Sequence, residues 1–263
     1  MAFPPERIIC LTEETVEALY LLGRDQLIAG VTGYAVRPAR VRKEKPRVAA
    51  FTSAHTDKIL ALKPDLVLAF SDLQADIVAD LIRYGIAVHC FNQRSVEGIF
   101  DMVRTLGALV DARDEAGLLV SRWRDRIESL KAAAPRARPR VYFEEWDEPM
   151  ITGIGWVSEL IGVAGGEDCF AHLRTQQAAK DRIIEPDEVI AAAPDIIIGS
   201  WCGKKFRPEK VAVRPGWAAI PAVKGGRMYE IKSPLILQPG PAALTDGLDA
   251  LVQIITSRGN GRL

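Results

Sequence analysis

The sequence predicts an α/β protein with two similar lobes, each built on a parallel sheet and joined by one long helix. The first observation is an internal repeat, because residues 57–71 and 187–201 align without a gap at an offset of 130 residues. Each copy reads as a short amphipathic helix, a Pro-Asp turn and a fully apolar strand, as in parallel sheets. The second observation is the stretch 113–131, whose apolar residues share one helical stripe.

The elements of the first lobe alternate between strand and helix, which indicates parallel pairing. Apolar runs of strand length are expected at 7–11, 27–31, 48–51, 66–70 and 87–91. Helical periodicity is expected at 14–22, in the first repeat, at 73–84 and at 96–110.

The long helix over 113–131 has its stripe at Leu119, Trp123, Ile127 and Leu130, and Pro135 and Pro139 follow it. The second lobe then restarts with a strand at 141–143 and a helix at 157–163. The second repeat, a strand at 227–231 and a last helix at 242–255 complete it. We therefore expect an N-terminal lobe over 1–112, a spanning helix over 113–134 and a C-terminal lobe over 135–263. A single helical crossing predicts a stiff pair with modest closure.

Composition excludes several classes of partner. The chain of 263 residues has 34 basic and 34 acidic residues, so no net charge attracts nucleic acid or an anionic membrane. No apolar run approaches the roughly 20 residues that span a bilayer, so we expect no membrane insertion. The N-terminal residues lack the pattern of a secretory signal, which predicts a cytoplasmic protein as written and a periplasmic one if the native N-terminus was trimmed.

Several ordered motifs carry a family resemblance. They are Arg7-Ile-Ile-Cys-Leu-Thr-Glu-Glu-Thr15, Leu22-Gly23, Ile28-Ala-Gly-Val-Thr32, the first repeat from Ile59 to Ala69, Tyr84-Gly85-Ile86 and Glu159-Leu-Ile-Gly-Val-Ala-Gly-Gly166. In this order they resemble the helix-spanned (class III) substrate-binding proteins of ABC importers for cobalamin, ferric siderophores and haem. The resemblance runs from about residue 7 to residue 255 and is closest to the cobalamin-binding branch.

The resemblance implies a small-molecule ligand held between the lobes, no catalysis and delivery to an ABC permease. It implies cobalamin as a bound ligand and no covalent cofactor. It also implies one acidic residue on each lobe that docks onto the permease, and the nearest matches are Asp76 and Glu209. We further expect a monomer.

Candidate ligand contacts follow from the rule that open α/β sheets bind ligands at the carboxyl ends of their strands. Aromatic rings there offer large area to a flat macrocycle, and carboxylates accept hydrogen bonds from ligand amides. The run of acidic residues 144–148 is equally consistent with a solvated strand end. The expected ligand-binding residues are Thr12, Glu13, Tyr34, Phe51, Thr52, Phe70, Ser71, Glu145, Trp146, Trp156, Trp201 and Lys204.

Alternatives stay open on the sequence. A siderophore or haem carrier would use the basic residues Arg37, Arg40, Arg42 and Lys43 toward anionic oxygens. A cytoplasmic corrinoid sensor or enzyme component would have kept the fold and lost the permease. We expect no enzyme and no metal site, since no G-x-S-x-G or H-E-x-x-H motif occurs and Cys169-x-x-His172 lacks further ligands. His55 is a loop histidine or an axial ligand to a cobalt or iron centre.

Overall fold

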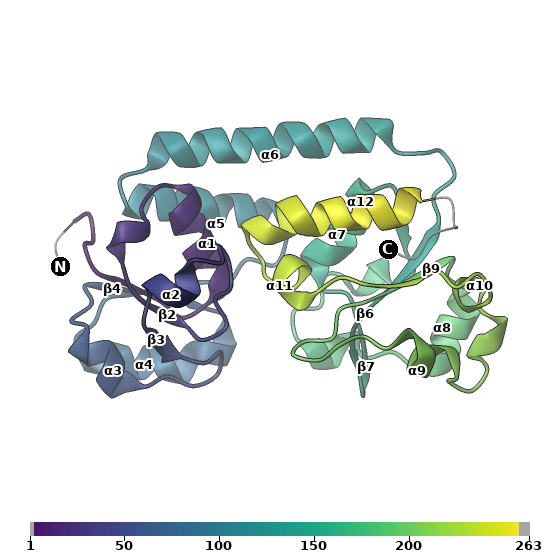
Figure 1. Cartoon of the computed structure of the whole chain (residues 1–263), viewed down its shortest axis with the longest axis horizontal. Helices are drawn as coiled ribbons and strands as arrows, with labels where there is room; N and C mark the ends of the chain where they lie inside the picture. The colour runs from purple at the N-terminus through teal and green to yellow at the C-terminus, as the bar shows by residue number, and fades with distance from the viewer. Residues whose placement is uncertain (1–2, 258–263) are drawn as a thin grey trace. The chain divides into compact units, whose positions relative to one another are not determined.

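The computed structural model describes residues 3–257 of the chain. The chain divides into two compact units, and each is described here by itself. Unit 1 comprises Met1–Gln93 and Glu97–Arg122, and unit 2 comprises Arg94–Val96 and Trp123–Leu263. Both units are α/β, as the repeat predicts (Figure 1).

Unit 1 contains a five-stranded, fully parallel sheet in the order β3-β2-β1-β4-β5. All five expected strands are present within two residues of their expected ends. The strands are β1 (Ile8–Cys10), β2 (Ile28–Thr32), β3 (Arg47–Ala49), β4 (Leu66–Phe70) and β5 (Val88–Phe91). The helices are α1 (Glu13–Leu21), α2 (Val41–Glu44), α3 (Thr56–Ala61), α4 (Ala75–Arg83) and α5 (Val96–Leu109).

One hydrophobic cluster of unit 1 forms on one face of this sheet. Side chains alternate along a strand, so Ile9 and Leu11 point to the same face as Val67 and Ala69 of the neighbouring strand. Leu81 of α4 completes this buried cluster together with residues of β3 and α3. All five residues of β4 are buried, which explains why its sequence is apolar without alternation.

The long helix α6 spans Arg113–Ala133, close to the expected range. Three positions of its apolar stripe, Leu119, Trp123 and Ile127, are buried. Its residues up to Arg122 belong to unit 1 and those from Trp123 to unit 2. The predicted helical stripe therefore contributes to the packing of both units.

Unit 2 contains a sheet in the order β10-β9-β6-β7, with β8 paired to β6. Helix α12 packs beside α7 in this unit (Figure 1). The strands are β6 (Arg140–Asp147), β7 (Met150–Thr152), β8 (Glu167–Asp168), β9 (Ile196–Gly199) and β10 (Met228–Glu230). The helices are α7 (Gly155–Val163), α8 (Pro186–Ala192), α9 (Pro208–Ala212), α10 (Pro221–Lys224), α11 (Ser233–Ile236) and α12 (Leu248–Thr256).

The first strand of unit 2 is longer than the sequence pattern predicts. The expected strand ends at residue 143, whereas β6 continues to Asp147. It continues because β7 folds back and pairs with it antiparallel, with Asp147 opposite Met150 and Trp146 opposite Ile151. The sequence pattern does not reveal this extension, because three of the residues 144–147 are acidic and strands are recognised by their apolar residues.

The internal repeat extends to backbone conformation. Lys63 and Ala193, which are 130 residues apart, both adopt the left-handed region with φ of 47° and 46°. Each directly precedes the proline of its repeat, and each ends a short helix. Non-glycine residues rarely adopt this conformation, so the two copies share a specific helix-to-strand turn.

The aspartate of each Pro-Asp pair anchors the first strand of its own sheet. The Asp65 carboxylate accepts hydrogen bonds from the backbone amides of Glu6 at 2.7 Å and Arg7 at 3.0 Å. The Asp195 carboxylate accepts one from the amide of Arg140 at 2.8 Å. The repeated Pro-Asp thus sets where β4 begins beside β1 and where β9 begins beside β6.

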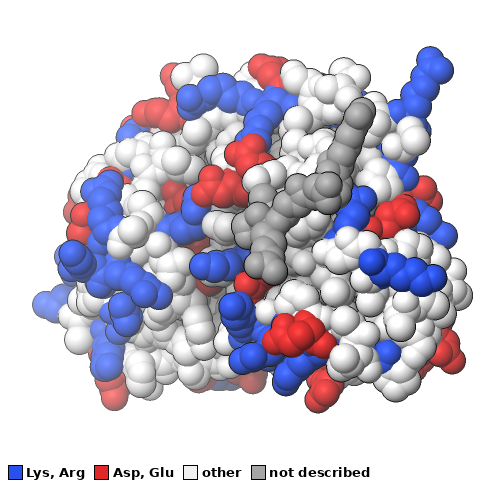
Figure 2. Space-filling view, turned by 45° about the vertical axis from the view of Figure 1, so that its right-hand side comes forward, with Lys and Arg blue, Asp and Glu red and all other residues white. Residues whose placement is uncertain are grey.

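Charged residues of both signs are interspersed over the face of the molecule shown in Figure 2. This distribution agrees with the equal numbers of basic and acidic residues. Within residues 3–257, no helix is long and apolar enough to cross a bilayer.

Candidate ligand-binding surface

The seven site residues expected in the first lobe follow the carboxyl ends of four strands of unit 1. These strands are parallel neighbours, so their carboxyl ends lie along one edge of the sheet. Tyr34 and Thr52 are exposed at this edge, and Phe51 is half-buried. Thr12 and Ser71 are buried, so they pack inside the unit and do not face solvent. The complete set is Thr12, Glu13, Tyr34, Phe51, Thr52, Phe70 and Ser71.

Gln74, which sequence reasoning missed, ties three of these strand ends together. Its side-chain oxygen accepts a hydrogen bond from the Phe70 amide at 2.9 Å. Its side-chain nitrogen donates to the carbonyl oxygens of Phe51 at 2.8 Å and Leu11 at 3.3 Å. Gln74 is fully buried, so no water competes for these bonds. A glutamine just before a helix carries no sequence signal that separates this role from a solvent-exposed one.

Ser71 has an unusual backbone at the end of β4. Its φ of 62° and ψ of 176° lie outside the regions that most non-glycine residues adopt, which costs on the order of 1–3 kcal/mol. The Ser71 amide donates to the Phe91 carbonyl at 2.8 Å, and its hydroxyl accepts from the Leu73 amide at 3.3 Å. These bonds hold the turn that leads the chain from the sheet edge toward Gln74.

Two adjacent glutamates with raised pKa values follow β1. Burial raises the pKa of Glu13 to about 7 and that of Glu14 to about 8, from a usual 4.5. The Thr12 hydroxyl donates to the Glu14 carboxyl at 2.5 Å. Near neutral pH these carboxyl groups carry protons for part of the time, so each can donate as well as accept a hydrogen bond. The sequence analysis included Glu13 but missed Glu14.

The raised pKa values predict that stability falls as pH rises. The folded protein holds protons that the unfolded chain releases near pH 4.5, so the stabilisation is complete below pH 4.5 and is lost through pH 7 to 8. We expect unfolding in urea to show a loss on the order of 2 kcal/mol between pH 6.5 and pH 8.5. Burial of Asp168 raises its pKa and acts in the same direction.

Glu14→Gln tests the source of this dependence, because the amide keeps a hydrogen-bond acceptor for Thr12 and has no charge. The variant should flatten the pH profile between pH 6.5 and 8.5, whereas Glu148→Gln, at an exposed position, should leave it as in the wild type. An unchanged profile in Glu14→Gln would contradict the assignment. The measurement starts at pH 6.5 because burial lowers the pKa of half-buried His89. At lower pH this histidine makes the free energy of unfolding rise with pH, which opposes the effect of the two glutamates.

In unit 2 a buried carboxylate, Glu144, holds an aromatic side chain at the end of β9. The Trp201 indole nitrogen donates to Glu144 at 2.9 Å and the Tyr142 hydroxyl donates to it at 2.8 Å. Arg214 completes the set with two parallel bonds at 2.6 and 3.0 Å, and its guanidinium lies 4.6 Å from the Trp217 ring centre. Sequence reasoning missed Glu144 and Arg214, which are 70 residues apart.

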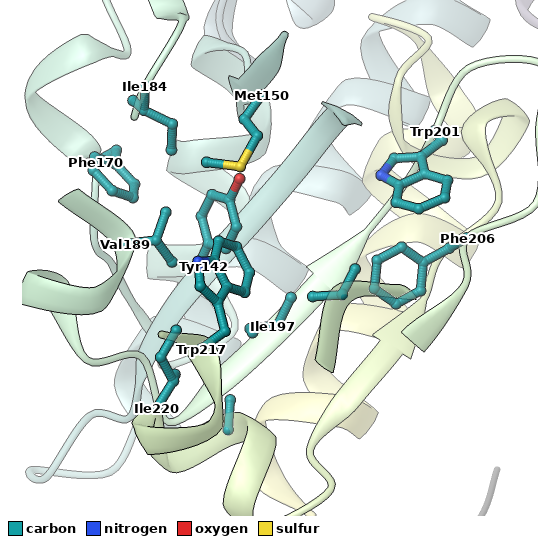
Figure 3. Packing of buried hydrophobic residues seen from close by; sticks show 12 residues of the cluster. Tyr142, Met150, Phe170, Ile184, Val189, Ile197, Trp201, Phe206, Trp217 and Ile220 are labelled. Carbon is teal, nitrogen blue, oxygen red and sulfur yellow. The ribbon is translucent and has the colours of Figure 1, made fainter. Parts of the chain in front are cut away.

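These rings form part of the hydrophobic core of unit 2. Figure 3 shows Tyr142 and Trp217 at the centre of the cluster, with Trp201 beside Phe206. The Trp201 and Phe206 rings meet edge to face at 5.0 Å. Phe206 also lies directly over Gly199, where any Cβ atom would come within 1.8 Å of its ring. Gly199 therefore lets the loop after β9 fold back and cover the strand end.

Glu145 pairs with an arginine of its own unit. Arg182, which is 1% exposed, donates to the two Glu145 oxygens at 2.7 and 3.3 Å and also to the Thr152 carbonyl. This bidentate pair balances the charge of the buried cation. Glu145 was expected to accept hydrogen bonds from a ligand, and in the structure both of its oxygens accept from Arg182.

Trp146, Trp201 and Lys204 come together in unit 2. The Lys204 ammonium lies 4.2 Å from the Trp146 ring centre and 5.1 Å from that of Trp201, and it forms an ion pair with Asp147. Trp146 is half-buried on β6, and Trp201 is 4% exposed at the end of β9. Three residues that were expected to contact a ligand thus form one cluster of two indole rings and an ammonium group.

Trp156 lies elsewhere. It belongs to α7 and is 2% exposed, and its indole nitrogen donates to the Ile236 carbonyl at 2.8 Å. These contacts give it a role in packing α7 against α11, and we leave it out of the proposed ligand contacts.

Asp76 and Glu209, expected to dock onto a permease, are both exposed on helices, α4 in unit 1 and α9 in unit 2. Glu209 lies 3.5 Å from Arg207. His55 is exposed at the start of α3. Among residues 3–257, no three His, Cys, Asp or Glu side chains gather as ligands for a metal ion.

Comparison with known proteins then identifies the family. A family model described as periplasmic binding protein matches residues 8–235, which is most of the chain. The chain belongs to the periplasmic binding protein family. The resemblance recognised from the ordered motifs is confirmed.

Two relatives and one solved structure illustrate what this binding protein is similar to. An uncharacterised ABC transporter substrate-binding lipoprotein, YvrC of Bacillus subtilis, is 27% identical over 95% of the chain and 80% of the relative. A vitamin B12-binding protein of Vibrio cholerae is 24% identical over 97% of the chain and 89% of the relative. A possible iron-binding protein from Staphylococcus epidermidis, known from its crystal structure, is 23% identical in sequence. The two structures superpose with a TM-score of 0.83 over 97% of this chain and 100% of that chain. This last likeness concerns the fold.

Proposed function

We propose that this protein binds a corrinoid, cobalamin, without changing it chemically and delivers it to an ABC importer. The observation that carries the proposal is the set of aromatic and hydrogen-bonding groups at the carboxyl ends of the strands of unit 1. The relationship to a vitamin B12-binding protein over nearly the full chain supports the same ligand class.

The chemistry of unit 1 suits a flat macrocycle that carries amide side chains. Tyr34 and Phe51 offer ring faces, and aromatic contacts bury large area at little conformational cost. Thr52 supplies a hydroxyl, and Glu13, with its pKa raised to about 7, can donate to an amide oxygen as well as accept from an amide nitrogen. Gln74 holds the Phe51 and Phe70 backbones in place.

A ferric siderophore or haem is the second candidate, and the similar fold of a possible iron-binding protein favours it. The basic residues after β2 argue against this candidate. Arg37 pairs with Glu17 at 2.9 Å, and Arg40 pairs with Asp25 and Glu44 and lies 4.5 Å over the Tyr20 ring. Partners within unit 1 thus already balance two of the cations that an anionic siderophore would need.

Delivery to a permease requires docking groups, and we propose Asp76 and Glu209 for that role because both carboxylates are exposed on helices. Reversing either charge to lysine should reduce transport in a reconstituted system and leave ligand affinity unchanged. Unchanged transport would contradict the docking role of these carboxylates, and a wild-type protein that supports no transport would instead favour a corrinoid sensor or enzyme component that acts without a permease.

The direct test is titration of the purified protein with cyanocobalamin, followed by tryptophan fluorescence and calorimetry. We expect saturable binding at micromolar ligand or below. Tyr34→Ala should weaken binding roughly fivefold, since one aromatic contact contributes about 1 kcal/mol. Tyr84→Ala is the matched control, because Tyr84 has a similar exposure, 60% against 56%, and lies at the opposite end of α4 from the strand ends. Binding of haem or a ferric siderophore without binding of cobalamin would overturn the proposal.

A further inference from the structure

We propose that unit 2 contains a binding site for an organic cation, a primary or methylated ammonium group. Trp146, Trp201 and Asp147 form this site, which we call the ammonium cage, and the Lys204 ammonium occupies it. The inference does not depend on the corrinoid proposal, since it concerns a different ligand class.

The walls of the cage are held in place by bonds that do not involve Lys204. The Trp201 indole donates to buried Glu144, and the Trp146 indole donates to the Glu148 carbonyl at 2.9 Å. Phe206 supports the Trp201 ring edge to face. A preorganised pair of rings loses little conformational entropy when a cation binds.

The cage has the chemistry of a cation site. The face of an indole ring attracts positive charge, and two such faces lie 4.2 and 5.1 Å from the same ammonium. Asp147 adds a carboxylate whose side chain is only 15% exposed, which strengthens its attraction for a cation. Anionic groups would meet repulsion from both the rings and the carboxylate.

A free organic cation can replace the Lys204 ammonium in the cage. Lys204 lies in the loop between β9 and α9, outside regular secondary structure, and its side chain is 41% exposed. Its long flexible stem can swing to solvent without disturbing the sheet. A free cation must compete with this tethered ammonium, whose effective concentration is on the order of millimolar or higher. Removing the Lys204 amine should therefore increase the affinity for a free cation.

The experiment is a titration with tetramethylammonium chloride, with sodium chloride adjusted to constant ionic strength and tryptophan fluorescence as the signal. We expect Lys204→Ala to bind saturably and at least tenfold more tightly than the wild type. Lys205→Ala should bind as the wild type does, because Lys205 is an exposed neighbouring lysine that has no part in the cage. Lys204→Ser serves as a second variant with the same expectation if Lys204→Ala folds poorly.

The walls are tested in the Lys204→Ala background. Adding Asp147→Asn or Trp146→Leu should weaken tetramethylammonium binding at least tenfold, while circular dichroism checks that both variants stay folded. The proposal is overturned if neither Lys204 variant binds saturably, if the wall variants bind as well as their parent, or if Lys205→Ala gains affinity as Lys204→Ala does. Cobalamin titrations of the same variants report separately on the corrinoid proposal.

Discussion

Replacing Glu144 by alanine is expected to lower the free energy of unfolding by about 3–5 kcal/mol. The Glu144 side chain is fully buried and accepts hydrogen bonds from Tyr142, Trp201 and Arg214. Its removal leaves the guanidinium of Arg214 and two other donors without an acceptor in a region that water reaches poorly. A lost hydrogen bond is far less costly than an uncompensated buried charge. Urea denaturation followed by tryptophan fluorescence measures the change.

Two controls separate this effect from simple loss of volume. The double variant Glu144→Leu with Arg214→Met removes both charges and should be more stable than Glu144→Ala, because no unpaired charge remains. Glu148→Ala, at an exposed position near the end of β6, should change stability by less than about 0.5 kcal/mol. If Glu144→Ala and Glu148→Ala behaved alike, the Glu144 network would contribute little to stability.

Replacing Gln74 by leucine is expected to lower the free energy of unfolding by about 2–4 kcal/mol and to loosen the strand ends of unit 1 that Gln74 joins. Leucine has a similar size but can neither donate nor accept a hydrogen bond. The Phe70 amide and the carbonyls of Leu11 and Phe51 would lose their partner, and each unsatisfied buried group costs about 1–3 kcal/mol, partly relieved by relaxation. Thermal unfolding measures the loss, and faster hydrogen exchange of the Phe70 amide reports on the edge itself.

The matched control for this variant is Gln26→Leu, because Gln26 is an exposed glutamine of the same unit. Gln26→Leu should alter the melting temperature little and leave exchange at Phe70 unchanged. Equal effects of the two variants would show that Gln74 does not organise the strand ends. If cobalamin binds as proposed, Gln74→Leu should also weaken it, since Phe51 would lose its fixed position.

Much of the fold could be predicted because local sequence periodicity encodes it. The apolar runs of β4 and β9, the stripe of α6 and the repeated Pro-Asp turn each follow from a few consecutive residues. The extension of β6 to Asp147 and the strand β7 were not predicted, because they depend on pairing with each other rather than on the pattern of either segment.

The candidate site could be predicted less fully, because hydrogen bonding and burial depend on residues distant in the chain. The seven residues expected in unit 1 follow the carboxyl ends of four neighbouring parallel strands, and two of them, Tyr34 and Thr52, are exposed. In the run 144–148, the sequence pattern could not distinguish a buried glutamate from an exposed one. Glu144 is fully buried against Arg214, whereas Glu148 of the same run is exposed.

The sequence by itself determined the α/β fold class and the family, and it predicted the strand ends as the place for a ligand. Short-range periodicity and ordered motifs are properties of neighbouring residues, so one sequence suffices to find them. Only the tertiary structure decided that Gln74 ties three strand ends, that Glu144 and Arg214 hold Trp201, and that Lys204 lies between two indoles. Gln74 bonds to strand ends 23 and 63 residues away, and Glu144 bonds to side chains 57 and 70 residues away, so a short window of sequence cannot reveal these roles.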